Sequence, residues 1–301
     1  MSHIASARAR LCWCVLIETL TCGICRSYRR EYGMSSVLTI TTPGASLSQQ
    51  KMPGHWVLAR LGKRVLRPGG MELTRRMIAA LTIVSADHVI EFAPGLGITA
   101  QLTLKRRPAS YTAIERDPAA AAIVSSYLKE STQKCVTGSA DQTGLRGEVA
   151  TVVYGEAMLT MQTSEMKRRI VREARRLLKR SGRYAIHEMC LVGDDLDEDR
   201  KHEINQTLSR TIHVGVRALS ASEWRRLMET EGFEVEVEAR EPMHLLEPKR
   251  LLRDEGLKGT VRFIWNIVRD RESRKRVLMM RKVFRRYQSN LAGVIMICVK
   301  R

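Results

Sequence analysis

One short stretch of the chain combines a carboxylate, a proline and two glycines in an order that could hold a ligand. Residues 88–92 read as a buried strand that carries one acid, Glu91. The run Ala93-Pro94-Gly95-Leu96-Gly97 then predicts a tight turn, and a helical pattern follows it. A strand, a tight loop and a helix N-terminus form the usual place where an α/β sheet holds a nucleotide-like ligand. Gly95 and Gly97 accept positive φ and have no Cβ, so a ligand can approach the backbone closely there.

The same loop also matches the dinucleotide pattern. Gly95, Gly97 and Ala100 have the spacing G-x-G-x-x-A, and Glu115 follows Gly95 by twenty residues. A nicotinamide enzyme is therefore one alternative, which the order of the elements along the rest of the chain must decide.

Hydrophobic periodicity predicts strands that alternate with helices after residue 51. The expected strands are 88–92, 110–115, 134–136, 150–154, 183–189, 234–239 and 292–299. The expected helices are 55–61, one around 73–81, 98–106, 118–129, 164–179, 198–211 and 221–231, the last opened by a capping box at Ser220 and Glu223. Ser181-Gly182 is expected to stop the helix that precedes the fifth strand.

This alternation predicts an α/β fold with a doubly wound, mostly parallel sheet of seven strands. Because no helix follows the last strand, that strand is expected to insert antiparallel. A dehydrogenase usually needs a second, substrate-binding domain, whereas this chain continues one sheet to its end, so the architecture disfavours the nicotinamide alternative.

Composition indicates an ordinary globular chain with an unusual charge. Of 301 residues, 44% are hydrophobic and 28% are charged, and the formal net charge is +19. No apolar run approaches the ~20 residues that span a bilayer. The charge predicts attraction to an anionic partner, such as nucleic acid, an acidic membrane surface or an anionic substrate, although a solvated basic surface explains it equally well.

The first fifty residues differ from the rest. Cys12, Cys14, Cys22 and Cys25 are four of the seven cysteines, and they could close a zinc site, although their spacing is not a standard one. An apolar run after Arg10 resembles a signal peptide but is interrupted by Glu18. The interpretation we favour is a poorly structured extension over 1–50, upstream of a true start at Met34 or Met52, followed by one domain over 51–301. The remaining cysteines are widely spaced and fit a reducing, cytoplasmic location.

An ordered set of short motifs makes residues 70–301 resemble the class I S-adenosylmethionine-dependent methyltransferases. The branch that looks most similar contains the ubiquinone and menaquinone C-methyltransferases and the phospholipid N-methyltransferases. The motifs, in order, are Glu91-x-Ala93-x-Gly95-x-Gly97, Glu115, Ala140-Asp141, Gly155-Glu156-Ala157, Leu178 to Arg183, His187-Glu188 and Glu231-Gly232-Phe233. Ala93 stands where the family usually has a glycine, and Ser181-Gly182 replaces its Pro-Gly-Gly.

The resemblance implies S-adenosyl-L-methionine as cofactor, no metal, and a role for each acid. Glu115 would accept the two ribose hydroxyls, and Asp141 would accept the adenine amino group beside the backbone of Ala140. Glu91 would hold the methionine end near Ala93, Gly95 and Gly97. Asp141 could instead be a loop cap, and Glu115 only the neighbour of a helix start.

The resemblance also indicates candidates for the general base. Residues after the fourth and fifth strands face the methyl group in this fold, which points to Glu156, His187 and Glu188 as catalytic candidates. Alternatively, His187 is a core histidine and Glu156 supports the cofactor loop. The chain lacks the Asn-Pro-Pro-Tyr and Pro-Cys motifs of enzymes that modify nucleobases.

Residues 241–290 form a basic insertion before the last strand, with fourteen Lys and Arg against six Asp and Glu. Apolar residues from Leu251 to Phe284 recur at helical spacing, which fits a helical lid over the active site, a surface that rests on anionic lipid, or both.

The sequence therefore predicts a cytoplasmic methyltransferase, in peripheral contact with a membrane, that acts on a small, apolar or lipid-like acceptor. An RNA methyltransferase and a non-catalytic binding protein of the same fold are the alternatives, with nucleic acid disfavoured because aromatic residues are only 5%. The sequence leaves the oligomeric state open.

Overall fold

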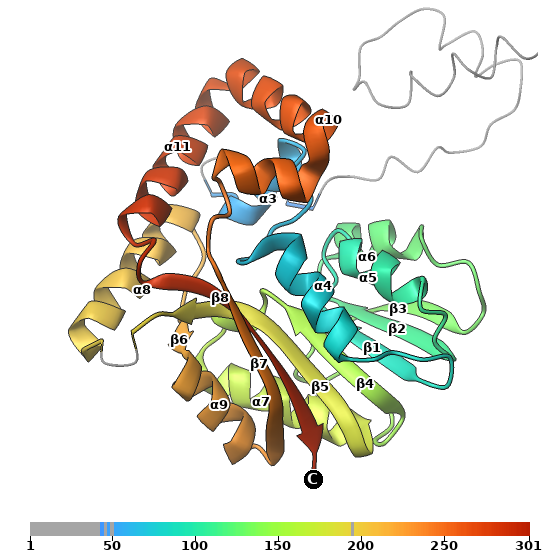
Figure 1. The fold of residues 1–301 in the computed structure, drawn as a ribbon. Helices are drawn as coiled ribbons and strands as arrows, with labels where there is room; N and C mark the ends of the chain where they lie inside the picture. Colours follow the sequence, from blue (N-terminus) through green and yellow to red (C-terminus); the bar gives the residue numbers. More distant parts are fainter. Residues whose placement is uncertain (1–42, 45–46, 49–50, 194–195) are drawn as a thin grey trace, which may run out of the picture. The chain divides into compact units, whose positions relative to one another are not determined.

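The computed structural model describes residues 43–44, 47–48, 51–193 and 196–301, and the cysteine-rich segment lies outside them (Figure 1). The strands are β1 (His88–Phe92), β2 (Ser110–Glu115), β3 (Gln133–Thr137), β4 (Ala150–Glu156), β5 (Leu178–Leu191), β6 (Leu219–Ser220), β7 (Phe233–Pro242) and β8 (Leu291–Lys300). The helices are α3 (Gly54–Arg60), α4 (Gly70–Ala80), α5 (Ile98–Leu104), α6 (Pro118–Ser125), the 3₁₀ turn η1 (Leu159–Met161), α7 (Ser164–Leu177), α8 (Glu198–Ile212), α9 (Ala221–Thr230), α10 (Pro248–Arg269) and α11 (Arg271–Arg286).

The sheet has the expected doubly wound architecture. Seven strands follow the order β3-β2-β1-β4-β5-β8-β7, and the two-residue β6 pairs with β5 beside this path. Strands β1 to β5 run parallel, whereas β8 lies antiparallel between β5 and β7. The prediction of a mostly parallel sheet with an inserted antiparallel last strand is confirmed.

Alternation along the strands divides the core into two layers. Val89, Val152 and Ala185 pack on the face that α4 covers, whereas their neighbours Ile90 and Val153 pack on the face of α7 and α9. Figure 1 shows α4, α5 and α6 on one face of the sheet and α7 and α9 on the other. Because the strands are covered on both faces, they appear in the sequence as nearly continuous apolar runs.

Two predicted boundaries are wrong. Helix α6 ends at Ser125, short of residue 129. Ser181-Gly182 does not stop α7, because the helix ends at Leu177 and β5 begins at the next residue. Ala150 pairs with Leu178 and Val152 with Arg183, so the extra residues form an irregularity in β5, where Ser181 has φ 60°.

A third apolar cluster builds a helical cap beyond the sheet. Side chains of α3, α8, α10 and α11 pack together there, with Val57, Leu58, Leu208, Phe263 and Phe284 among the buried members. The helical insertion before β8 is therefore present as two helices. Within the described ranges, no helix is both long and apolar enough to pass through a bilayer.

The apolar residues that recur at helical spacing in the insertion do not all face the same way. Its apolar residues divide into a buried set, Leu251, Val277, Met280, Val283 and Phe284, and an exposed set, Leu257, Val261, Ile264, Trp265, Val268 and Leu278. Gly256 explains part of this division, because its φ of 69° interrupts α10 and changes which side chains face inward.

Candidate active site

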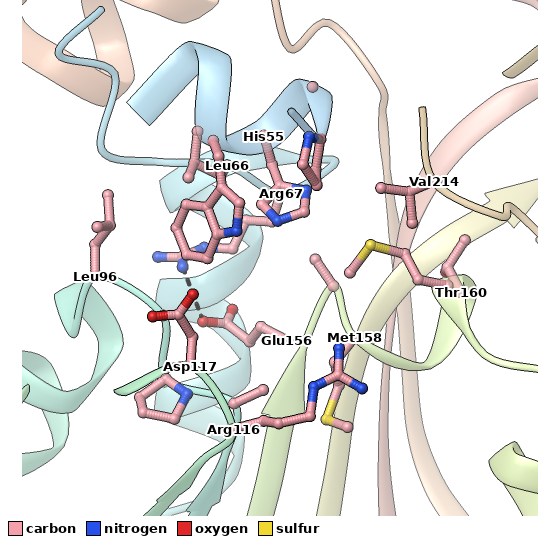
Figure 2. Close-up of a pocket in the computed structure, with 18 of the residues that line it drawn as sticks. His55, Leu66, Arg67, Leu96, Arg116, Asp117, Glu156, Met158, Thr160 and Val214 are labelled. Carbon is pink, nitrogen blue, oxygen red and sulfur yellow. Dashed lines mark ion pairs between the residues drawn. The ribbon is translucent and has the colours of Figure 1, made fainter. Parts of the chain in front are cut away.

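A cavity of about 740 Å³ lies where the carboxyl ends of β1, β2 and β4 meet the helical cap. Small-ligand sites typically occupy ~300–1,000 Å³, and in doubly wound sheets they lie at this edge. Figure 2 shows His55 and Arg67 on the helical side of the cavity, with Glu156 and Asp117 on the side of the strand ends. The cavity therefore has a polar side, formed by the sheet, and a second side formed by the cap.

The loop after β1 reaches the cavity at Ala93 and Gly95. A Cβ added at Gly95, which has φ 56°, would meet nothing within 4 Å, so the backbone is open to a ligand there. Gly97 is different, because it does not line the cavity and its added Cβ would lie 2.7 Å from the ring of Tyr127. The structure thus relates Gly97 to the packing of α5 against α6 and Gly95 to the site. Ala93 adopts φ 50°, the strained conformation for which a glycine is usual.

Glu91 lies beneath this loop and is 3% exposed. Its Oε2 accepts from the hydroxyls of Tyr111, at 2.5 Å, and Tyr154, at 2.7 Å. Both bonds go to Oε2, and no described residue bonds Oε1. Burial raises the pKa of the Glu91 carboxyl to about 7, although the two tyrosine bonds oppose that rise.

Glu115 closes β2 and supports the glycine loop. One carboxylate oxygen accepts from the Gly95 N–H and the other from the Asp117 N–H, both at 2.9 Å. Asp117 in turn caps α6 by accepting from Ala119 N–H at 2.8 Å. Glu115 lines the cavity, so its remaining lone pairs face a ligand.

The loop after β3 contributes Ser139 and Ala140 to the cavity, but not Asp141. The Asp141 carboxylate pairs with Arg169 at 2.5 Å and accepts from the Ser139 hydroxyl at 2.5 Å. In the described structure Asp141 holds the shape of this loop, and its contact with an adenine amino group stays a prediction.

Glu156, at the end of β4, is held from several sides. Its Oε1 accepts from Thr74 and lies 2.7 Å from Nδ1 of His187, and its Oε2 accepts from Thr99 and pairs with Arg67 at 3.2 Å. Burial alone would raise the pKa of this carboxyl, but Arg67, His187 and Thr74 outweigh it and lower the pKa to about 2. A carboxylate with so low a pKa accepts protons poorly at neutral pH, so a role as general base is disfavoured.

His187 is fully buried and does not line the cavity. Its Nδ1 faces the Glu156 carboxylate, and its Nε2 lies 2.5 Å from the carbonyl of Pro68. Both ring nitrogens are occupied by these two contacts, and the ring lies outside the cavity, so neither nitrogen is open to a substrate. Of the two interpretations of His187, the geometry supports the core histidine.

Glu188 is also fully buried away from the cavity. It accepts from the backbone N–H groups of Met158, Leu159 and Thr160, at 2.8–3.0 Å, and from the Thr160 hydroxyl. Burial raises the pKa of its carboxyl, and these bonds oppose that rise. Glu188 therefore positions the turn η1, whose residues line the cavity.

Apart from polar residues such as His55 and Arg67, the cap side of the cavity is apolar. The apolar lining residues include aliphatic and thioether side chains and one phenyl ring, and all of these but Met158 and Met161, which come from the loop after β4, lie on this side: Leu58, Leu66, Met158, Met161, Met189, Ile212, Val214, Val216, Met243, Leu245, Met280 and Phe284. The five methionines come from four separate parts of the chain, because Met158 and Met161 share the loop after β4. Thioether side chains adapt to irregular apolar shapes, so this side suits an apolar ligand.

Sequence reasoning missed several polar residues of the cavity, among them His55, Arg67 and Arg116. Burial lowers the pKa of the His55 imidazole to about 4, with a smaller opposing effect from Asp117, so this ring is neutral at pH 7. The Nη1 of Arg67 pairs with Glu156, while its buried Nε has no hydrogen-bond partner among the described residues. The available signal in the sequence for Arg67 is a cation beside a Pro-Gly turn, Arg67-Pro68-Gly69-Gly70.

Comparison with known proteins identifies a relative and a domain. An uncharacterized protein of Haemophilus influenzae is 32% identical over 236 residues, which cover 77% of this chain and 91% of that protein. Residues 90–186 match the family described as "Methyltransferase domain", a range that runs from β1 into β5.

Solved structures agree on the fold. The MccD protein superposes with a TM-score of 0.63 at 17% identity, over 78% of this chain and 99% of that one. A phosphoethanolamine N-methyltransferase of Haemonchus contortus, in complex with phosphomonomethylethanolamine and S-adenosylhomocysteine, superposes with a TM-score of 0.63 at 12% identity, over 85% of this chain and 59% of that one.

Proposed function

This chain belongs to the class I S-adenosylmethionine-dependent methyltransferases, in the same family as the Haemophilus influenzae protein, and we propose that its acceptor is a small apolar molecule. The acceptor would occupy the methionine-lined side of the cavity. The observation that carries this proposal is the division of one cavity into a polar sheet side and an apolar cap side.

The polar residues of the cavity, from the sheet side and from Arg67 opposite it, fit S-adenosylmethionine. The open backbone at Gly95 and the lone pairs of Glu115 suit a ribose that presents two hydroxyls. The Oε1 of Glu91 suits an ammonium group, and the guanidinium of Arg67, with its unbonded Nε, suits a carboxylate. When bound, the cofactor supplies an activated methyl group on a sulfonium.

His55 is the proton acceptor we propose for an acceptor molecule that carries an O–H or N–H. Of the described residues that line the cavity, it is the single histidine, and its imidazole is neutral at pH 7. Holding donor and acceptor in line would account for much of the rate, and removal of the acceptor's proton for the rest. If methyl transfer goes to a thioether, which has no proton to lose, His55→Asn lowers the rate little.

Calorimetric titration of the full chain with S-adenosylhomocysteine tests the cofactor. We expect micromolar binding by the native protein and at least a hundredfold loss in Glu115→Ala. Glu130→Ala, an exposed glutamate in the loop before β3, is the control and keeps full affinity. Absence of binding by native protein that shows a normal thermal unfolding transition would remove the enzyme interpretation.

The acceptor is then sought by turnover with radiolabelled S-adenosylmethionine. Quinone, phospholipid, small amine and RNA fractions are compared, and labelling of apolar small molecules is the result expected. Labelling of RNA alone would replace the proposal with the alternative drawn from the net charge.

A further inference from the structure

The second half of helix α10 presents an apolar face to solvent. Five side chains at spacings of three and four residues, each 50–71% exposed, form it: Leu257, Val261, Ile264, Trp265 and Val268. At 100° per residue these positions fall within about one quarter of the helix circumference. Single exposed apolar residues are ordinary, but a continuous stripe of this kind marks an interaction surface.

The opposite side of the same helix is fixed against the cap, so the stripe cannot rotate inward. Phe263 is buried in the cap cluster, and Ile267 packs against that cluster. The amide of Asn266 donates to the Leu61 carbonyl at 3.0 Å. The outward direction of the stripe is thus a property of the folded protein.

Basic residues accompany the stripe along one side. Lys258, Arg262 and Arg269 follow it and are exposed, and Arg269 stacks on the ring of Trp265 at 4.9 Å. The neighbouring acids are already engaged, because Asp254 and Glu255 lie buried beside Lys63 and the Asp270 side chain caps α11. The outward side of this part of α10 is therefore apolar and positively charged.

We propose that this surface, Leu257, Val261, Ile264, Trp265 and Val268 with Lys258, Arg262 and Arg269, binds the face of an anionic lipid bilayer. The apolar side chains would enter the boundary between headgroups and acyl chains, and the cations would contact lipid phosphates. This α10 surface lies parallel to the membrane in the proposal, since an interfacial helix needs one apolar face rather than an apolar circumference.

Other partners fit the surface less well. A nucleic-acid site needs cations and stacking aromatics, whereas four of the five apolar side chains here are aliphatic. A second copy of the same surface would bring its cations against those of the first. The lipid proposal does not depend on the proposed methyl transfer.

Vesicle flotation of the full chain tests the proposal. Pure phosphatidylcholine vesicles are compared with vesicles in which a third of the lipid is phosphatidylglycerol. We expect at least tenfold stronger partitioning onto the anionic vesicles, and a further loss of at least tenfold in Ile264→Asp and in Trp265→Ser. The matched control is Val84→Asp, which alters an equally exposed apolar residue, 55% exposed, in the loop before β1.

The charges are tested by a second pair of variants. Lys258→Glu combined with Arg269→Glu is expected to lower partitioning at least tenfold, whereas Lys105→Glu combined with Arg106→Glu, the same change of net charge before β2, leaves it within threefold. High salt should weaken the native protein's binding to anionic vesicles and abolish the difference between these two pairs.

Tryptophan fluorescence locates the contact with lipid. Trp265 emission should shift to the blue and be quenched by lipids brominated on the acyl chain, and Trp265→Leu should remove that quenching.

Two outcomes of these experiments would overturn the proposal: equal partitioning of native protein and Ile264→Asp, or quenching by brominated lipid that persists in Trp265→Leu. So would a native dimer that Ile264→Asp dissociates, or RNA binding that the α10 variants abolish without any vesicle binding. S-adenosylhomocysteine titration of the same variants keeps the cofactor question separate, because the α10 surface lies outside the cavity.

Discussion

The two sides of the cavity differ in the chemistry of the side chains that line them. On the sheet side, Glu91, Glu115 and Glu156 each accept at least two hydrogen bonds from neighbouring groups. On the cap side, thioether and aliphatic side chains such as Met189, Met243 and Met280 meet from several separate segments, and these side chains carry no strong hydrogen-bonding group.

This difference indicates what each side selects. Carboxylates that are oriented by fixed neighbours recognise the positions of particular hydroxyl and ammonium groups. Methionine side chains recognise apolar volume and tolerate variation in its shape. Affinity for one defined cofactor is therefore expected to depend on single residues of the sheet side, whereas affinity for the acceptor is distributed over the cap.

Two acids of the sheet side also differ from each other. Glu91 and Glu156 lie near the carboxyl ends of adjacent strands and are both buried, yet burial raises the pKa of Glu91 to about 7, while Arg67 and His187 outweigh burial and lower that of Glu156 to about 2. The hydrogen-bond partners of Glu91 are two neutral tyrosine hydroxyls, which leave the pKa of its carboxyl near 7. Arg67 and His187 keep Glu156 ionised.

The largest effect should come from Glu156→Gln, which removes the negative charge that pairs with Arg67. We expect a loss of about 3 kcal/mol in the free energy of unfolding at pH 7, measured by urea denaturation, because the buried Arg67 guanidinium remains without its counter-charge. The folded pKa of Glu156 is depressed, so its contribution is present above the unfolded value of about 4.5 and is lost as the pH falls toward about 2.

Glu148→Gln is the control for that measurement, because Glu148 is exposed and pairs with Lys300 at the surface. It should change the unfolding free energy by less than about 0.5 kcal/mol. Equal effects of the two substitutions would show that the network around Glu156 is not a preorganised unit.

The second-largest expected effect tests whether the apolar side of the cavity can be altered without changing affinity for the cofactor. Met280 lines the cavity and its neighbour Met279 faces solvent at 55% exposure, so the same change to serine can be compared at both positions. Met280→Ser should weaken binding of an apolar acceptor or fluorescent probe about tenfold and lower stability by about 2 kcal/mol. Both variants should bind S-adenosylhomocysteine within threefold of native protein, and a large loss of cofactor affinity in Met280→Ser would show that the two sides are not separable.

The smallest effect concerns Glu91 and pH. Because the pKa of Glu91 is about 7, its carboxylate forms between pH 6 and 8, and affinity for S-adenosylhomocysteine should rise about fivefold to tenfold over that interval. Glu91→Gln should bind more weakly and without this rise. A native titration series that is flat between pH 6 and 8 would argue against contact between Glu91 and the ligand's ammonium group.

The raised pKa of Glu91 predicts that its contribution to stability changes with pH in the opposite direction to that of Glu156. Its folded pKa is raised, so the stability that its proton contributes is present below about pH 4.5 and is lost as the pH rises through about 7. Comparison of native protein and Glu91→Gln by thermal unfolding at pH 5 and pH 8 measures this contribution.

The sequence alone determined the architecture and the position of the polar side of the cavity. Apolar runs that alternate with helical patterns require a covered parallel sheet, and the carboxyl ends of parallel strands must share one edge. The residues that end β1, β2 and β4 therefore had to meet, and Glu91, Glu115 and Glu156 do line one cavity. The domain boundary at residue 50 and the zinc alternative at Cys12 to Cys25 stay predictions, because they concern residues outside the described part of the chain.

Only the tertiary structure decided which polar side chains face the cavity. Glu156 and His187 are register partners on adjacent strands, yet the first lines the cavity and the second is enclosed by Pro68 and Thr74, which reach it across more than a hundred residues of sequence. His55 and Arg67 enter the cavity because the segment before β1 packs against the cap. In α10, Phe263 and Trp265 are two residues apart in an apolar run, and which of them is exposed depended on the surface that α3 presents. Long-range contacts of this kind leave no local periodicity, so the sequence could supply the candidates but not their orientation.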